Sequence, residues 1–82
     1  HKRFFASLYK FIYHNQTLNF AENLDKIAKQ FNISKTDLNI MVQVFIELDF
    51  VSVHDGFVKI NPNAAQKSLT TSTTYQKYLA GR

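Results

Sequence analysis

The middle of the chain changes its apolar spacing from that of a helix to that of a strand. Ser34 can accept a hydrogen bond from a first-turn amide, and the apolar residues after it recur every three or four positions. These residues are Leu38, Met41, Val42, Phe45 and Leu48. From Phe50 the period becomes two, and Asp55 with Gly56 accepts the positive φ angles of a two-residue turn. The pattern predicts a helix that ends near Asp49, followed by a β-hairpin.

The turn also sets which residues of the predicted hairpin face each other. Pairing outward from it places His54 opposite Phe57, Val53 opposite Val58, Ser52 opposite Lys59, and Val51 opposite Ile60. The two aliphatic pairs then share one face of the hairpin. A slip of one residue would turn that face to water, so we expect this register.

A first helix is predicted over residues 2–14, with an apolar face wider than a surface helix needs. One side of it carries Phe4, Leu8, Phe11 and Ile12. A second stripe, Phe5, Tyr9 and Tyr13, follows at a spacing of four. Two interpretations are open: the C-terminal tail of the same chain covers this aromatic stripe, or the stripe docks another domain or protein.

A second helix is predicted to start at residue 20 or 21 and to end at Phe31. Asn19 and Glu22 have the spacing of a capping box, which favours this start. Residues 18–20 also suit a short strand beside the hairpin, and this alternative stays open.

Asn32 tolerates the left-handed conformation that ends a helix, so a tight turn leads from the second helix into the third. One helix, then a helix-turn-helix, then a hairpin is the order of a winged-helix domain. We therefore expect an α+β fold over residues 1–62, a small winged helix with three helices and a β-hairpin wing.

A third helix that reads DNA needs polar and basic side chains on its outer face, because base edges are recognised by donors and acceptors. The outer face here carries Thr36, Asn39, Ile40, Gln43, Ile46 and Glu47. With Val44 the helix is apolar nearly all round, and Glu47 and Asp49 would repel phosphate. We expect protein to cover this helix.

Residues 63–82 form a tail rich in Ser and Thr, a composition typical of disordered linkers. Its large apolar side chains argue against disorder: Leu69, Tyr75, Tyr78 and Leu79. Thr71 or Ser72 can cap a last short helix that carries the two tyrosines. We expect this tail to return onto the first helix and pack against the aromatic stripe.

The chain has 82 residues, no Cys and a net charge of +4. That length suits one small domain, and without Cys neither disulfides nor thiolate metal sites can form. No apolar run approaches the ~20 residues that cross a bilayer, so we expect no membrane contact. The start at His1 instead of Met indicates a piece of a longer protein.

The positive charge is concentrated at the two ends of the chain, whereas residues 21–58 carry three more acids than bases. Such an arrangement predicts a basic surface on which nucleic-acid phosphates can bind. The candidates are Lys2, Arg3, Lys10, Lys59, Lys67 and Lys77, and Arg82 adds to the C-terminal charge.

Catalytic chemistry finds little support in the sequence. His1, His14 and His54 lie far apart, and no acid stands at ligand spacing beside the first two. Gly56 and Gly81 are the only glycines, so no glycine-rich phosphate loop is present, and no Ser or Thr has a paired base. We therefore expect no catalytic residue, no metal site and no cofactor in this chain.

Four stretches together carry a resemblance to a known family. They are residues 44–51, the turn at Gly56, the pair Asn61 and Pro62, and the tail residues 67–72 with Tyr75 and Gln76. They are similar to the C-terminal extension of the bacterial single-stranded-DNA-specific exonucleases of the RecJ family. The first helix, with Phe4, Tyr9, Phe11 and Ile12, is similar too, so the resemblance spans nearly the whole chain. That family carries acids where this chain has Ser68 and Thr71, which makes this tail more basic.

The resemblance implies a role in bacterial DNA repair and recombination, in the cytoplasm. Enzymes of this family degrade single-stranded DNA from the 5′ end with divalent metal ions, which Asp and His clusters hold in a separate catalytic core. Those clusters are absent from this sequence. The resemblance therefore implies a hydrolase parent and a non-catalytic C-terminal module.

Three functions are compatible with these features. The favoured one is a module that docks onto its own catalytic core, or onto a single-strand-binding or other repair protein. Its docking candidates are Phe5, Tyr9, Tyr13, Ile40, Gln43 and Ile46. The second is sequence-independent binding of single-stranded DNA by the basic surface and stacking rings. The alternative is a stand-alone winged-helix transcription regulator that dimerises through the first helix and the tail.

Overall fold

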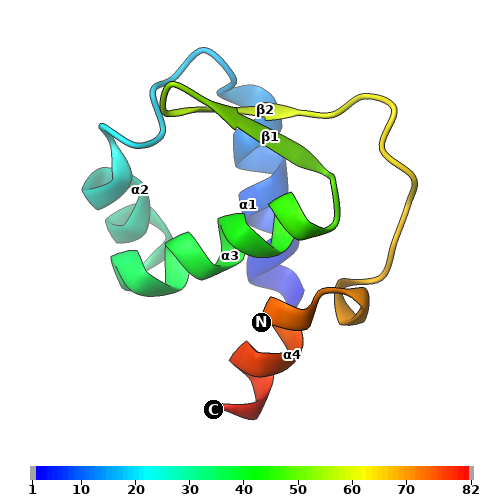
Figure 1. The fold of residues 1–82 in the computed structure, drawn as a ribbon. Helices are drawn as coiled ribbons and strands as arrows, with labels where there is room; N and C mark the ends of the chain where they lie inside the picture. The colour runs from blue at the N-terminus through cyan, green and yellow to red at the C-terminus, as the bar shows by residue number, and fades with distance from the viewer. Residues whose placement is uncertain (1, 82) are drawn as a thin grey trace.

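The computed structural model describes residues 2–81, so His1 and Arg82, which entered the metal and charge arguments above, lie outside the described residues. The fold is α+β, with a two-stranded antiparallel sheet among helices (Figure 1). Its elements are α1 (Lys2–His14), α2 (Leu24–Phe31), α3 (Lys35–Glu47), β1 (Val51–His54), β2 (Phe57–Ile60), the 3₁₀ turn η1 (Leu69–Thr71) and α4 (Thr73–Ala80). This order is consistent with a winged helix that gains a fourth helix.

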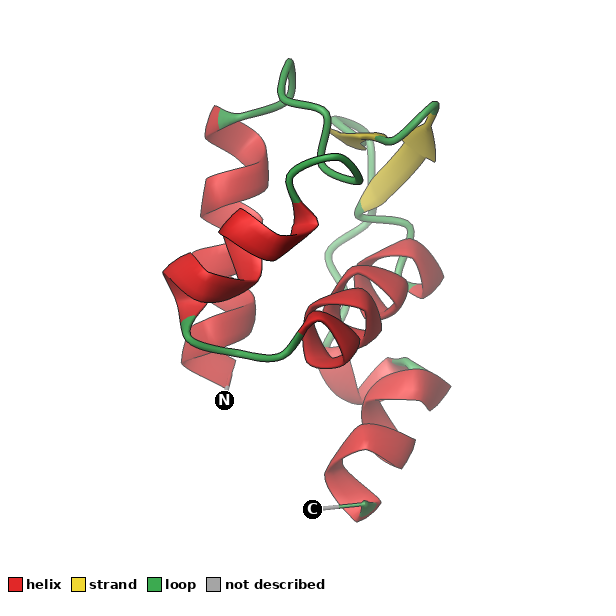
Figure 2. Ribbon diagram, turned by 90° about the vertical axis from the view of Figure 1, so that its left-hand side faces the viewer, coloured by secondary structure: helices red, strands yellow, loops and turns green. Residues whose placement is uncertain are grey.

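One apolar core lies between the first three helices and the hairpin. The two strands lie at one end of the helices and α4 projects at the other (Figure 2). The most enclosed core side chains come from α1, from α3 with its C-cap, and from the tail: Phe5, Leu8, Ile12, Leu38, Val44, Phe45, Leu48 and Tyr75. Because Tyr75 belongs to the tail, residues 63–82 contribute to the same core as residues 1–62.

Local signals for helix ends in the middle of the chain are confirmed. The Ser34 hydroxyl accepts from the Asp37 amide at 3.0 Å and caps α3. Asn32 takes the left-handed conformation, with φ of 56°, and ends α2. Asp49 also has a positive φ, of 63°, where the chain leaves α3 for the hairpin. The tight turn between α2 and α3 therefore forms as the sequence indicated.

The predicted start of the second helix at residue 20 or 21 is wrong, because α2 begins at Leu24. The Asn19 side chain does accept from the Glu22 amide, at 3.1 Å, as the capping box required. Its backbone, however, pairs with Phe57 in an isolated bridge, which bears out the alternative of strand-like pairing beside the hairpin. Pairing with the hairpin holds the chain extended there and delays the helix by a turn.

The hairpin has the predicted register, from Val51 opposite Ile60 to His54 opposite Phe57. Asp55 and Gly56 have φ of 52° and 87°, as the two-residue turn requires. At the far end Val53 is 48% exposed, although the pattern placed it inward. Its cross-strand partner Val58 is only 4% exposed, so the core covers β2 at this level and leaves Val53 of β1 outside.

The tail forms the predicted helix, and Ser72 caps it by accepting from the Tyr75 amide at 3.1 Å. It also returns to the first helix, where the ring of Phe5 meets Tyr75 at 5.3 Å and Tyr78 at 6.4 Å between centroids. The helix α4 packs mainly against α3. It therefore covers part of the apolar surface of α3, as the composition of that helix predicted. The helix does not extend over the rest of the aromatic stripe.

Candidate functional site

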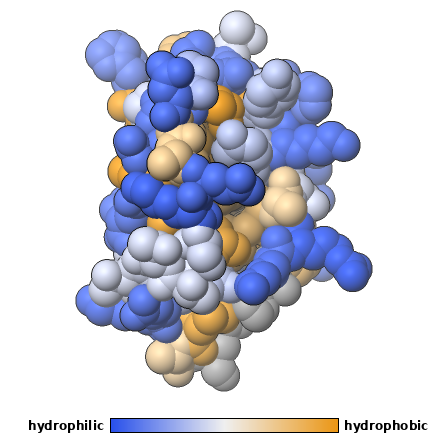
Figure 3. Space-filling view, turned by 90° about the vertical axis from the view of Figure 1, so that its right-hand side faces the viewer, coloured by the Kyte–Doolittle hydropathy of each residue, from blue (hydrophilic) through white to orange (hydrophobic). Residues whose placement is uncertain are grey.

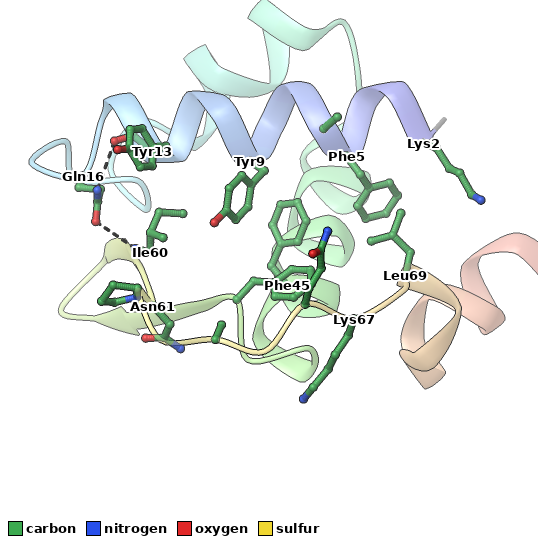
Figure 4. Close-up of a pocket in the computed structure, with 15 residues that line it drawn as sticks. Lys2, Phe5, Tyr9, Tyr13, Gln16, Phe45, Ile60, Asn61, Lys67 and Leu69 are labelled. Atoms are coloured by element: carbon green, nitrogen blue, oxygen red, sulfur yellow. Dashed lines mark hydrogen bonds between the residues drawn. The ribbon is translucent and has the colours of Figure 1, made fainter.

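A groove of about 950 Å³ lies between α1 and the strap, the name used here for residues 61–68, which connect β2 to η1 (Figure 4). The wall on the helix side consists of Lys2, Phe5, Ala6, Tyr9 and Tyr13. The strap side consists of Asn61, Pro62, Ala64, Gln66 and Lys67. The predicted aromatic stripe and two of the predicted phosphate-binding lysines therefore line a single groove.

The helical spacing of α1 explains why the three rings of the stripe line the same groove. Residues four apart lie one above another on a helix, and Figure 4 shows the Tyr9 ring pointing from α1 toward the strap, between Tyr13 and Phe5. Phe5 is buried, Tyr9 is half-buried and Tyr13 is 58% exposed. Access to the rings therefore increases along α1 from Phe5 to Tyr13.

Two aromatic residues from other elements form the floor of the groove and fix the inner rings. Tyr9 makes edge-to-face contacts with Phe45 at 5.9 Å and with Phe50 at 6.2 Å between ring centroids. Phe5 contacts Phe45 in the same way, at 5.8 Å. Such contacts favour one ring orientation, so the floor is preorganised.

The strap is anchored where it leaves the hairpin. Asn61 donates from its side chain to the Asp49 carbonyl at 2.9 Å, and its backbone amide donates to the Phe50 carbonyl at 2.9 Å. The Gln16 side chain accepts from the Ile60 amide at 3.0 Å (Figure 4). These bonds join the end of α1, the end of α3 and the start of the strap, and they hold this end of the groove together.

The charge around the groove is positive. Lys2 and Lys67 stand on opposite walls, and no Asp or Glu belongs to the lining as far as residues 2–81 define it. Lys59 lies beside one end of the groove, where its ammonium group donates to the Gln16 carbonyl at 2.8 Å. In Figure 3, which shows the side of the molecule with the strap, orange apolar atoms lie at the centre with blue polar side chains around them.

The remaining phosphate-binding candidates are exposed but are not part of the groove lining. Arg3 and Lys10 lie on α1, and Lys77 lies on α4. The structure therefore brings Lys2, Lys67 and the neighbouring Lys59 to the groove and leaves the other three cations outside its lining.

The docking candidates on α3 lie away from the groove. Ile40 is half-buried, Gln43 is exposed and Ile46 is 38% exposed. Val44 of the same helix is fully buried, and α4 packs against α3. The tail therefore covers part of the apolar surface of α3, and the docking candidates Gln43 and Ile46 remain exposed on it.

Glu47 has a role that the sequence interpretation missed. Its carboxylate accepts from the Ser72 hydroxyl at 2.8 Å, from the Thr74 amide at 3.1 Å and from the Thr74 hydroxyl. The bonds from the Thr74 hydroxyl and amide, followed by the Ser72 hydroxyl, lower the pKa of Glu47 from 4.5 to about 2. Glu47 therefore joins α3 to the first turn of α4. In the sequence, the hydroxyl groups of Ser72 and Thr74, which can donate to a carboxylate, are the feature that indicates this contact.

The other titratable groups that the sequence raised are at the surface. His14 is exposed, and His54 lies at the hairpin turn with its Nε2 3.4 Å from the Asp55 carboxylate. Across residues 2–81, no group of three or more His, Cys, Asp or Glu side chains is placed to hold a metal ion. No helix in this part of the chain has both the length and the apolar character needed to span a membrane.

Comparison with known proteins agrees with the resemblance of the tail and hairpin. The family described as single-strand DNA-specific exonuclease, C terminal domain, matches residues 1–81. The single-stranded-DNA-specific exonuclease RecJ of Bacillus subtilis (strain 168) is 29% identical over 72 residues, which are 88% of this chain and 9% of that relative. No solved structure gave a significant match. The chain therefore belongs to the family of C-terminal domains of single-strand DNA-specific exonucleases.

Proposed function

We propose that this domain is a non-catalytic accessory module of a RecJ-like exonuclease and that it acts by docking a partner in the groove between α1 and the strap. The observation that carries the proposal is the groove itself, a preformed concave surface with an aromatic floor and lysines on both walls. Preformed apolar clefts with a few polar groups are the usual form of a binding site. The parent supplies the hydrolytic chemistry and its divalent metal, in DNA repair in the cytoplasm.

A role as a duplex reader has less support, because α3 is the helix that would enter the major groove. Tyr75 and α4 pack against it, and the Glu47 carboxylate at its end carries negative charge. Its one basic residue is Lys35, whose ammonium group is 3.2 Å from the Asp25 carboxylate. Both features oppose phosphate binding at this helix, which weighs against the stand-alone transcription regulator.

The docked partner belongs to one of three kinds: the catalytic core of the same enzyme, a single-strand-binding or other repair protein, or single-stranded DNA. A second surface for a protein partner is the exposed strip of α3 around Ile46, which is 38% exposed next to Gln43. Apolar groups left on a surface in this way mark interfaces when they are contiguous. The groove is favoured because it is both concave and charged.

Variants of the full-length exonuclease that carries this domain test which surface acts. Tyr13→Ala opens the groove without removing a buried group, and Ile46→Ala does the same on α3. Lys26→Gln on α2 serves as the control for a neutral surface change. We expect the groove variant alone to slow degradation of single-stranded DNA several-fold, with all three proteins folded by circular dichroism.

Loss of activity in Ile46→Ala alone would move the docking surface to α3 and overturn the assignment to the groove. Full activity in the groove variant, and in an enzyme that lacks the whole domain, would overturn the accessory role itself. Binding of the isolated domain to duplex DNA more tightly than to single strands would favour the transcription regulator.

A further inference from the structure

We infer that the groove holds a short length of single-stranded DNA, with bases stacked on Tyr9 and Tyr13 and phosphates beside Lys2 and Lys67. The inference rests on the proposed function and names the partner that the groove takes. Three features carry it: the spacing and exposure of the two rings, the absence of acids from the described lining, and the hydrogen bonds that already engage the side-chain amides of Gln16 and Asn61.

The two tyrosines offer separate stacking positions. They are four residues apart on one face of α1, which is about 6 Å along a helix axis. Neighbouring bases in a stacked strand are only ~3.4 Å apart, which is closer than the two rings. Two neighbouring bases must therefore separate from each other before each can stack on its own tyrosine. Tyr13 is 58% exposed and Tyr9 is half-buried, with the Tyr9 ring held by edge contacts to Phe45 and Phe50. Tyr9 thus offers a ring held in place and Tyr13 an accessible one, and aromatic rings stack on bases of any sequence.

The charges fit a phosphate backbone. Lys2 rises from the first turn of α1 and Lys67 from the strap, so each wall of the groove contributes one cation. In Figure 4 both side chains extend outward, Lys67 on the side of the strap away from α1, so the two ammonium groups lie at the rim of the groove. Lys59 stands beside the end of the groove nearest Gln16. No carboxylate belongs to the lining within the described chain, so a polyanion meets attraction from both walls. The Asp49 carboxylate at the Asn61 end of the groove is already hydrogen-bonded to the Asn61 side chain, at 3.2 Å.

Two of the three side-chain amides in the described lining of the groove are engaged by the protein itself. Asn61 donates to the Asp49 carbonyl and carboxylate, at 2.9 and 3.2 Å. Gln16 accepts from the Ile60 amide at 3.0 Å and donates to the Tyr13 carbonyl at 3.2 Å. Base reading needs donors and acceptors that are directed at base edges, and these two are directed at the protein. The third amide, Gln66, is exposed on the strap, so recognition rests mainly on stacking and charge.

A duplex does not satisfy the same groove. Its base faces are covered by their neighbours, so Tyr9 and Tyr13 would have to unstack a base pair before either ring could contact a base face. An acidic peptide with apolar side chains would also meet the lysines and the aromatic floor. Such a peptide presents a planar ring only where it carries an aromatic residue, whereas every nucleotide of a single strand presents one to Tyr9 and Tyr13. The experiment must separate these two occupants.

Titration of labelled oligothymidine with the 82-residue chain at low salt, followed by fluorescence anisotropy, tests the inference. We expect a Kd of about 10⁻⁴ to 10⁻⁶ M at physiological salt, the usual range of sequence-independent binding, and tighter binding at low salt. Tyr13→Ala should weaken binding by at least about fivefold, the lower bound for loss of one stacked base, whereas Tyr13→Phe should keep it. Lys67→Gln should lower the slope of log K against log salt by about 0.7, the value for one phosphate on a single strand.

Lys26→Gln, on the exposed face of α2, is the matched control and should leave affinity unchanged. Equal loss in Lys26→Gln and Lys67→Gln, or tighter binding to a duplex of the same length, would overturn the inference. So would a flat titration of the folded chain. If the titration is flat while Tyr13→Ala still slows the full-length enzyme, the groove takes a protein partner and the proposed function stands without DNA.

Discussion

Aromatic side chains have different roles on the two sides of this domain. On the side of α3 and α4, Tyr75 and Val44 are completely enclosed, and the Glu47 carboxylate ties the two helices together. On the side of α1 and the strap, Tyr9 and Tyr13 face an open groove with lysines on both walls. Aromatic residues on the first side stabilise the fold, and those on the second are available to a partner.

The difference between the two sides comes from what the tail does after the hairpin. The strap crosses at a distance from α1 and leaves the groove open, and the next residues fold into α4 and close over α3. An acid is placed on the closed side, where Ser72 and Thr74 provide it with donors. The apolar content of a face therefore does not show whether that face stabilises the fold or binds a partner. The polar groups around the face distinguish the two cases.

The largest effect should come from the closed side. Tyr75→Ala removes a fully buried ring that contacts Phe5 and should lower the free energy of unfolding by about 3–5 kcal/mol. Urea denaturation followed by circular dichroism measures the loss, and Tyr75→Phe, which keeps the ring, should retain most of the stability. A loss below about 1 kcal/mol in the alanine variant would mean that α4 does not belong to the cooperative core.

A smaller effect should follow from removal of the cap of α4. Ser72 is buried, accepts from the Tyr75 amide and donates to Glu47, so Ser72→Ala should cost about 0.5–2 kcal/mol. The matched control is Ser68→Ala, which removes the exposed cap of η1. If the two variants lose the same free energy of unfolding, the contact between α3 and α4 does not stabilise the domain more than the exposed cap of η1 does.

The pH dependence of stability should reveal the Glu47 carboxylate. Because its hydrogen bonds lower its pKa from 4.5 to about 2, its contribution is complete above pH 4.5 and is lost as the pH falls toward 2. Glu47→Gln keeps one acceptor oxygen and should lose less than Ser72→Ala at pH 7. It should also flatten the fall in unfolding free energy between pH 4.5 and 2. Parallel curves for the variant and the parent chain would contradict this role.

The smallest effect on stability should come from the open side. Tyr13→Ala removes a ring that is 58% exposed, so the free energy of unfolding should change by less than about 0.5 kcal/mol. Thermal unfolding of Tyr13→Ala and Tyr75→Ala under the same conditions compares the two losses of stability. Comparable losses in the two variants would mean that Tyr13 serves the core, and the contrast between the two sides would then fail.

The local parts of the fold were readable from the chain. Ser34, Asn32 and the Asp55 turn each act on neighbours within four residues, so helix ends and the hairpin register followed directly. The start of α2 could not be predicted in this way, because it depends on the pairing of Asn19 with Phe57, which is 38 positions further on. The aromatic stripe was visible as a spacing of four on α1, but the sequence left open whether anything covered it.

The sequence by itself determined the helices, the hairpin and the supply of aromatic and basic side chains, because these depend on dihedral preferences and spacing within a few residues. Only the tertiary structure decided that the strap leaves a groove and that α4 closes on α3. The contacts responsible join positions far apart: Gln16 with Ile60, Asn61 with Asp49, and Glu47 with Thr74. Such contacts form only when the whole core has assembled, and no local pattern in the chain encodes them.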